Sequence, residues 1–123
     1  DYAKQVDKNM GLVIMDTPGN DPSSVAGMAA GGCQICLFST GRGTPTGNPI
    51  VPVIKITGNK VTYANMSDNI DIDASPYIYG KKTLEELGDE LFTEIKQVAD
   101  GKLTKAEALG HREFGIYKVS GTF

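Results

Sequence analysis

The sequence predicts an α/β fold: a Rossmann-like, three-layer arrangement in which helices flank a mostly parallel sheet. Short apolar runs of strand length occupy residues 12–15, 34–39 and 51–57, and each is followed by Gly, Pro, Asn or Ser residues. A helical pattern over residues 21–30 separates the first two runs. Strand, helix and strand within about 30 residues form a βαβ unit with parallel strands and a right-handed connection.

Length and composition indicate one domain over residues 1–123. The chain has 40% apolar residues, a net charge of −3 and a sequence pI near 5.0, with dispersed Lys and Arg. This charge gives no basic surface for nucleic acid. The sequence contains no apolar run long enough to span a membrane and does not start with a signal peptide, so we expect a cytoplasmic protein without nucleic-acid or membrane partners.

The elements follow from local signals. Residues 12–15 are expected to form a buried strand, and Asp21 and Pro22 then begin a helix as its N-cap and first residue. Gly31 and Gly32 end that helix before the strand over residues 34–39. Pro52 confines the early part of the run 51–57 to a sheet edge or a strand start.

Two loops are expected to meet at one edge of this sheet. Parallel strands place their C-terminal loops together, so residues 16–19 should lie beside residues 39–44. An open α/β sheet binds its ligands at this edge. Asp16 is therefore a candidate metal ligand or contact to a substrate hydroxyl, and a candidate catalytic residue.

The loop after the strand 34–39 has the composition of an anion site. Gly41 and Gly43 allow positive φ and close approach of backbone N–H groups, and Arg42 offers a planar, bidentate fork. The candidate substrate-binding residues are Ser39, Thr40, Gly41, Arg42, Gly43 and Thr44. A nucleotide fingerprint is not formed, because its third glycine would stand at Thr46.

Three further charged residues have two interpretations each. Lys55, inside an apolar run, is either a side chain in solvent with a packed stem, or part of a polar site where burial lowers its pKa and makes it a candidate base. Alternation over residues 68–73 puts Asp71 and Asp73 on one side. They either hold a divalent cation or form the acidic face of an exposed edge strand.

The remaining signals are structural. Thr83 with Glu86, and Thr104 with Glu107, form capping boxes; the first helix has a regular apolar stripe and stops at Gly101. His111 is expected to be a capping or surface residue, with general base as the alternative. The tail 115–123 is expected to dock on the surface. Cys33 and Cys36 are either buried free thiols or a redox or metal pair.

Several motifs together resemble the altronate and galactarate dehydratase family. They are GLVIMDTPGNDP (11–22), AGGCQI (30–35), FSTGRGTPTGNP (38–49), PVIKITGN (52–59), DID (71–73) and GHREF (110–114). They cover nearly the whole chain in the family's order, and the tail from Glu113 to Lys118 is more similar to the altronate branch. Ser75 departs from the family pattern, where glycine is common.

The resemblance implies a function for a larger protein. Family members are several times longer, so the chain is expected to be the C-terminal part of a hydro-lyase that converts an aldonic or aldaric acid to a 2-keto-3-deoxy acid. The resemblance also implies a divalent metal, Fe(II) or Mn(II), whose other ligands lie in the missing segments. The expected partners are a sugar acid, the remaining domains and a second copy in a homodimer; the isolated fragment is expected to be inactive. A sulfolactate-type sulfo-lyase and a non-catalytic anion-binding α/β module are the alternatives.

Overall fold

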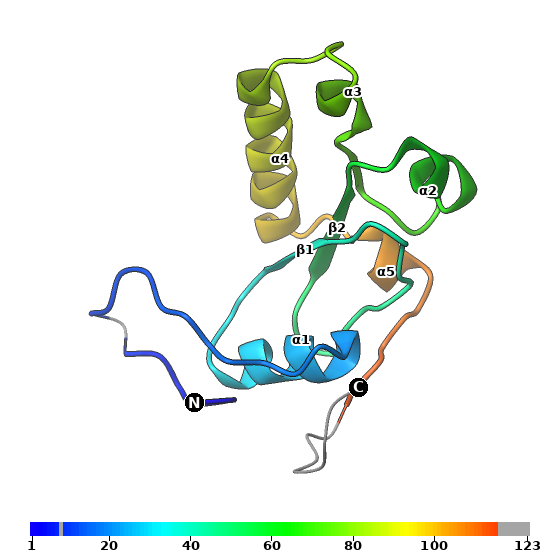
Figure 1. Cartoon of the computed structure of the whole chain (residues 1–123). Coiled ribbons are helices and arrows are strands. Elements are labelled where there is room, and N and C mark those ends of the chain that lie inside the picture. The colour runs from blue at the N-terminus through cyan, green and yellow to red at the C-terminus, as the bar shows by residue number, and fades with distance from the viewer. Residues whose placement is uncertain (8, 116–123) are drawn as a thin grey trace.

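The protein has a three-stranded parallel sheet, which confirms the predicted α/β class (Figure 1). The structure, a computed structural model, describes residues 1–7 and 9–115. The strands are β1 (Cys36–Ser39), β2 (Val53–Thr57) and β3 (Ile72–Asp73), in the order β1-β2-β3. Cys36 pairs with Val53, and Ile56 pairs with Ile72, so β2 is the central strand.

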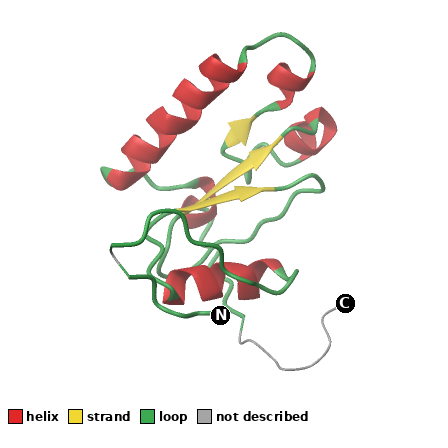
Figure 2. Ribbon diagram, turned by 60° about the vertical axis from the view of Figure 1, so that its left-hand side comes forward, coloured by secondary structure: helices red, strands yellow, loops and turns green. Residues whose placement is uncertain are grey.

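Helices cover both faces of this sheet (Figure 2). They are α1 (Asp21–Ala30), α2 (Lys60–Asn65), α3 (Ser75–Ile78), α4 (Leu84–Ala99) and α5 (Lys105–Ala108). On the α1 side, Val25 packs with Val53 and Cys36 in one apolar cluster. On the α4 side, Val98 packs with Ile54 and Ile72 in another. The alternation of side chains along β2 therefore divides the core into two parts.

The predicted strand over residues 12–15 is wrong. These residues form no strand, and Leu12 and Ile14 are 96% and 88% exposed. The reason is a missing partner: a strand needs a neighbouring backbone, and residues 11–16 make no hydrogen bond to another residue that the structure describes. The expected βαβ unit therefore lacks its first strand.

Helices α1, α4 and α5 begin and end close to the predicted residues, whereas α2 and α3 were not predicted. In α1 the cap is Asn20 rather than Asp21, because the Asn20 side chain accepts a hydrogen bond from the Ser23 N–H at 3.2 Å. Both capping boxes are confirmed, at Thr83 for α4 and at Thr104 for α5. Gly101 follows α4 with φ of +104°.

Among the described residues no helix is long and apolar enough to cross a membrane.

Both cysteines are free thiols, as the first interpretation had it. Cys36 is buried in the cluster beside α1, and Cys33 is half-buried and donates to the carbonyl of Ile35 at 2.9 Å. The predicted docking of the tail falls mainly on residues 116–123, which lie outside the described residues.

Candidate active site

The carboxyl ends of all three strands open into one cleft. Since β1, β2 and β3 are parallel, the residues that follow them, Thr40, Gly58 and Ala74, lie at the same edge of the sheet. The cleft has a volume of about 740 Å³ and is lined by Ser39, Thr40, Gly41, Ile56, Gly58, Asn59, Ala74, Ile78 and Tyr79. This edge is the position at which open α/β sheets bind ligands.

The loop of residues 39–49, which we call the glycine-arginine loop, begins in the wall of this cleft. The Thr40 N–H continues the ladder to Ile56 O at 2.9 Å, and the Thr40 hydroxyl accepts a hydrogen bond from the Gly43 N–H at 3.0 Å. Gly43 has φ of +86°, and a Cβ there would lie 2.3 Å from the Met66 sulfur. The positive φ favours glycine at this turn.

A side-chain clamp joins the loop to the end of β2. The Gly41 carbonyl accepts hydrogen bonds from the Thr62 hydroxyl at 2.8 Å and from Asn59 Nδ2 at 3.2 Å. Asn59 also caps α2 through its Oδ1, which accepts from the N–H groups of Val61 and Thr62. Asn59 therefore positions the loop and lines the cleft. It was not among the predicted site residues, although an Asn directly after a strand is a signal for a helix cap.

Arg42 is exposed and follows the cleft residue Gly41. Its guanidinium makes no ion pair or hydrogen bond with the residues that the structure describes. A bound carboxylate would therefore not have to displace a protein partner from this group.

The other predicted binding residues divide into two sets. Ser39, Thr40 and Gly41 line the cleft. Gly43 and Thr44 do not: the Gly43 N–H is bonded to Thr40, and the Thr44 hydroxyl is buried 2.8 Å from that of Thr46. The structure thus gives Gly43 and Thr44 contacts within the loop.

Lys55 is completely buried, so the interpretation that it is solvated is wrong. Its side chain has no exposed surface, and Nζ donates to the carbonyls of Pro45 and Thr46, each at 3.3 Å. Burial lowers the pKa of Lys55, against the opposing effect of Asp71 and Glu113. The side chain does not line the cleft. From the central strand β2, it holds the glycine-arginine loop through these two hydrogen bonds.

Asp71 and Asp73 have backbone partners. The Asp71 carboxylate accepts from the Lys55 N–H at 2.7 Å through Oδ2 and from the Lys105 N–H at 2.9 Å through Oδ1, which joins β2 to α5. Asp73 Oδ1 accepts from the Ser75 N–H at 2.9 Å. Both side chains are half-buried, so they do not form the exposed acidic face of an edge strand.

Asp16 is exposed and lies outside the cleft lining. The expected proximity of residues 16–19 to residues 39–44 depended on the strand at 12–15, which is absent. Within the part of the chain that the structure describes, no three His, Cys, Asp or Glu side chains gather closely enough to hold a metal ion. The described residues alone therefore do not fit the implied divalent metal.

A second contact fixes the loop from the C-terminal side. Glu113 Oε2 accepts from the Gly47 N–H at 2.8 Å, while Oε1 lies 2.9 Å from His111 Nδ1. Burial works to raise the pKa of Glu113, but bonds from Gly47 and His111 outweigh it, and that pKa is lowered. His111 is thus half-buried and paired with Glu113. No local signal in the sequence joins residues 66 positions apart.

The comparisons with known proteins agree with one another. Residues 1–122 match the family described as D-galactarate/Altronate dehydratase, C-terminal. The chain is 43% identical to the (2R)-sulfolactate sulfo-lyase subunit beta of Chromohalobacter salexigens over 109 residues, which are 89% of the chain and 28% of that protein. It is 40% identical to the altronate dehydratase of Escherichia coli, with 94% of the chain and 23% of that protein covered. For the altronate dehydratase of Bacillus subtilis the identity is 36%, with 96% and 24% covered.

The chain thus spans about a quarter of the length of these curated relatives. The match extends over the cleft, the glycine-arginine loop and the residues that fix it. The chain belongs to the galactarate/altronate dehydratase family and matches its C-terminal portion.

Proposed function

We propose that this chain is the C-terminal part of a hydro-lyase that dehydrates an aldonic or aldaric acid, altronate or galactarate, to a 2-keto-3-deoxy acid. One observation carries the proposal: the cleft at the carboxyl edge of the sheet, with Ser39, Thr40 and Gly41 in its wall and the unpaired Arg42 guanidinium directly after them. The names of the dehydratase relatives give the class of reaction.

Arg42 has the charge and shape to bind the substrate carboxylate. Dehydration removes the proton α to this carboxylate and expels the β-hydroxyl as water, so negative charge builds on the carboxylate as the proton leaves. A planar guanidinium stabilises that charge through two parallel hydrogen bonds. Ser39 and Thr40 line the cleft, and we assign to their hydroxyls the contacts to sugar hydroxyls; the Asn59 amide is bonded to the Gly41 carbonyl.

The acid and base have to come largely from elsewhere. Among the described residues that line the cleft, only Tyr79 has a titratable side chain. The assignments of Lys55 as base and Asp16 as catalytic residue stay predictions, because neither side chain lines the cleft. We assign these roles to the remaining domains of the parent enzyme, and we expect the isolated chain to be inactive.

The divalent metal also stays a prediction. Fe(II) or Mn(II) would act as a Lewis acid, but its ligand set needs residues outside the described part of this chain. Of the three predicted ligands, Asp73 lies nearest in sequence to the cleft, next to Ala74 in its lining.

A sulfo-lyase is the second candidate, and a specific observation favours it. The relative with 43% identity is a (2R)-sulfolactate sulfo-lyase subunit. Loss of sulfite from a sulfonated hydroxy acid begins with the same proton abstraction beside a carboxylate, so the same cleft and Arg42 suit both reactions.

The test is turnover by the full-length parent enzyme. Altronate, galactarate and sulfolactate are incubated with metal-supplemented enzyme, and keto-acid product and released sulfite are followed separately. For the preferred substrate, Arg42→Ala is expected to lower kcat/KM by about 10- to 100-fold, the value of a lost charge-assisted hydrogen-bond pair. The control is Arg112→Ala, at the chain's other arginine, which is also exposed.

The outcomes separate the hypotheses. Keto acid without sulfite, from a sugar acid, supports the hydro-lyase, and sulfite release supports the second candidate. An Arg42→Ala enzyme that behaves like Arg112→Ala contradicts the carboxylate assignment. No turnover by folded, metal-loaded enzyme favours a non-catalytic anion-binding module.

A further inference from the structure

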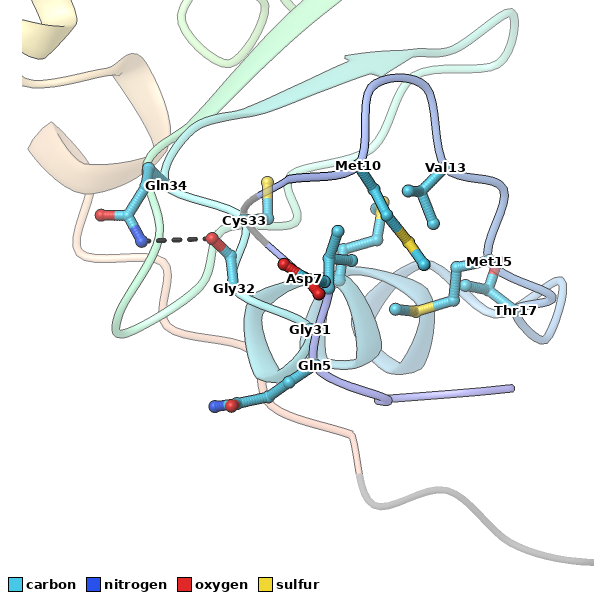
Figure 3. Close-up of a pocket in the computed structure, with 12 residues that line it drawn as sticks. Gln5, Asp7, Met10, Val13, Met15, Thr17, Gly31, Gly32, Cys33 and Gln34 are labelled. Carbon is cyan, nitrogen blue, oxygen red and sulfur yellow. Dashed lines mark hydrogen bonds between the residues drawn. The ribbon is translucent and has the colours of Figure 1, made fainter.

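Residues 12–15 have the side-chain pattern of a strand but no strand partner. Leu12 and Ile14 are 96% and 88% exposed, whereas Val13 and Met15 line a cavity of about 660 Å³ beside α1 (Figure 3). Alternate side chains thus face opposite sides, as in a pleated strand. One side contacts this domain, and the other presents two large apolar side chains to solvent.

The backbone of this segment is equally unpaired. Residues 11–16 make no hydrogen bond to any other residue that the structure describes. Four consecutive apolar residues with free N–H and C=O groups are a template for another strand.

The segment is held at a fixed place on the domain. Before it, the Tyr2 hydroxyl donates to Ser23 O at 2.6 Å, and the Val6 N–H donates to Gly31 O at 3.0 Å. After it, the hydroxyls of Thr17 and Ser24 are 2.9 Å apart. Contacts with α1 and the residue after it thus flank the exposed stretch on both sides, so the stretch is presented outward from an anchored base.

The wall that supports the segment is adaptable. Met10, Met15 and Met28 line the same cavity, together with Val6 and Val13. Unbranched thioether side chains repack easily around a new neighbour. The segment can therefore adjust to a partner strand without disturbing the sheet, because neither β1 nor β2 lines this cavity.

The lengths of the relatives indicate the partner. The matched family is a C-terminal portion, and the alignments cover only 23% to 28% of the three relatives. In a protein of that kind most of the polypeptide precedes the matched stretch, and residues 12–15 stand close to the junction.

We propose that residues 12–15 form a strand that pairs with a strand from the upstream portion of the same polypeptide, whose apolar side chains cover Leu12 and Ile14. This proposal shares with the proposed function the placement of the chain at the C-terminal end of a longer enzyme. It does not depend on the reaction that the enzyme catalyses.

The experiment is hydrogen exchange of the full-length parent, without substrate, followed by mass spectrometry. Amides in a peptide that covers residues 12–15 are expected to exchange on the order of 100-fold more slowly than unstructured amides. Exchange at the unstructured rate overturns the proposal. Protection that disappears when the protein is diluted from oligomer to monomer assigns the contact to a second copy and also overturns it.

Substitutions give an independent readout. Leu12→Asp with Ile14→Asp is expected to abolish the protection of residues 12–15 and to leave that of β2 unchanged. The matched control is Leu103→Asp, at a leucine that is 62% exposed and lies far from this segment in the sequence. Equal effects of the double variant and the control contradict the proposal. Absence of sugar-acid turnover by the unsubstituted parent enzyme, with residues 12–15 protected, counts against the proposed function alone.

Discussion

At the scale of single residues, Asp71 has a structural role that its sequence pattern did not indicate. Alternation with Asp73 favoured either a cation pair or an exposed acidic edge. The carboxylate instead accepts one backbone N–H from β2 and one from the first residue of α5, with N–O distances of 2.7 and 2.9 Å. Asp71 therefore links β2 to α5 through its side chain, although Lys55 and Lys105 are 50 residues apart.

Replacing Asp71 tests this role. Asp71→Asn keeps one acceptor oxygen and turns an amide NH2 toward a backbone donor, so we expect the free energy of unfolding to fall by about 1.5–3 kcal/mol. Asp16→Asn, at an exposed aspartate, is the control and should change stability by less than about 0.5 kcal/mol. Urea unfolding gives both values. Equal midpoints for the two variants would show that the Asp71 bonds contribute nothing net.

At the scale of elements, the sequence predicted the features that depend on residues close together in the chain, such as helix caps. Both capping boxes form as read, since each joins residues only three positions apart. The prediction of a strand at residues 12–15 was wrong because a strand depends on a partner that is distant in the sequence. The segment's apolar composition is suitable, but a strand exists only where a second backbone lies alongside, and the sequence of one segment does not contain that information. The strands β1 and β2 were predicted, because turn residues bound both apolar runs, but the predicted parallel partner of residues 34–39 was 12–15 and not β2.

The α4 capping box gives a prediction at this scale. Thr83 Oγ1 accepts from the Glu86 N–H at 3.1 Å, and Glu86 Oε2 accepts from the Thr83 N–H at 2.7 Å. Thr83→Ala should lower the free energy of unfolding by about 1 kcal/mol. Thr93→Ala, at an exposed position inside the same helix, should raise it by up to about 0.5 kcal/mol, because alanine is the better helix former.

Opposite signs in thermal unfolding of the two alanine variants are the expected result, and the same sign would contradict the assignment of Thr83 as cap. The bonds to Thr83 also lower the pKa of Glu86. Stabilisation by the Glu86 carboxylate is therefore present above the ordinary glutamate pKa and is lost as the pH falls through the lowered value.

At the scale of the whole molecule, the sequence predicted a loop at residues 39–44 at the carboxyl edge of the sheet, and the structure has a cleft there. The binding role of these residues stays a prediction. The contacts to the loop from residues distant in the sequence were not predicted. The Glu113 contact to Gly47 and the burial of Lys55 beneath residues 45 and 46 depend on tertiary packing, for which the sequence has no periodic or local signal.

The buried thiol of Cys36 makes the free energy of unfolding fall at alkaline pH. Burial is the main cause that raises the pKa of Cys36 to about 11, and nearby Cys33 adds to it. The unfolded chain loses this proton first, from about pH 8.5 upward, so the folded state loses stability as the pH rises toward 11. Cys36→Ala removes this titration. The difference in unfolding free energy between wild type and Cys36→Ala should therefore shift against the wild type by about 3 kcal/mol between pH 8 and pH 11. Parallel stability curves over that range would contradict the burial of this thiol.

The burial of Lys55 limits how the glycine-arginine loop can be transferred to another protein. Its two acceptors, the carbonyls of Pro45 and Thr46, belong to the loop, but the lysine belongs to the middle of the neighbouring strand. Moving residues 39–49 alone onto another parallel sheet would leave these carbonyls without their donor. A portable unit therefore contains the loop, β2 and the residues that hold the Gly41 carbonyl, residues 39–62, and a recipient scaffold has to accept a buried lysine in its central strand.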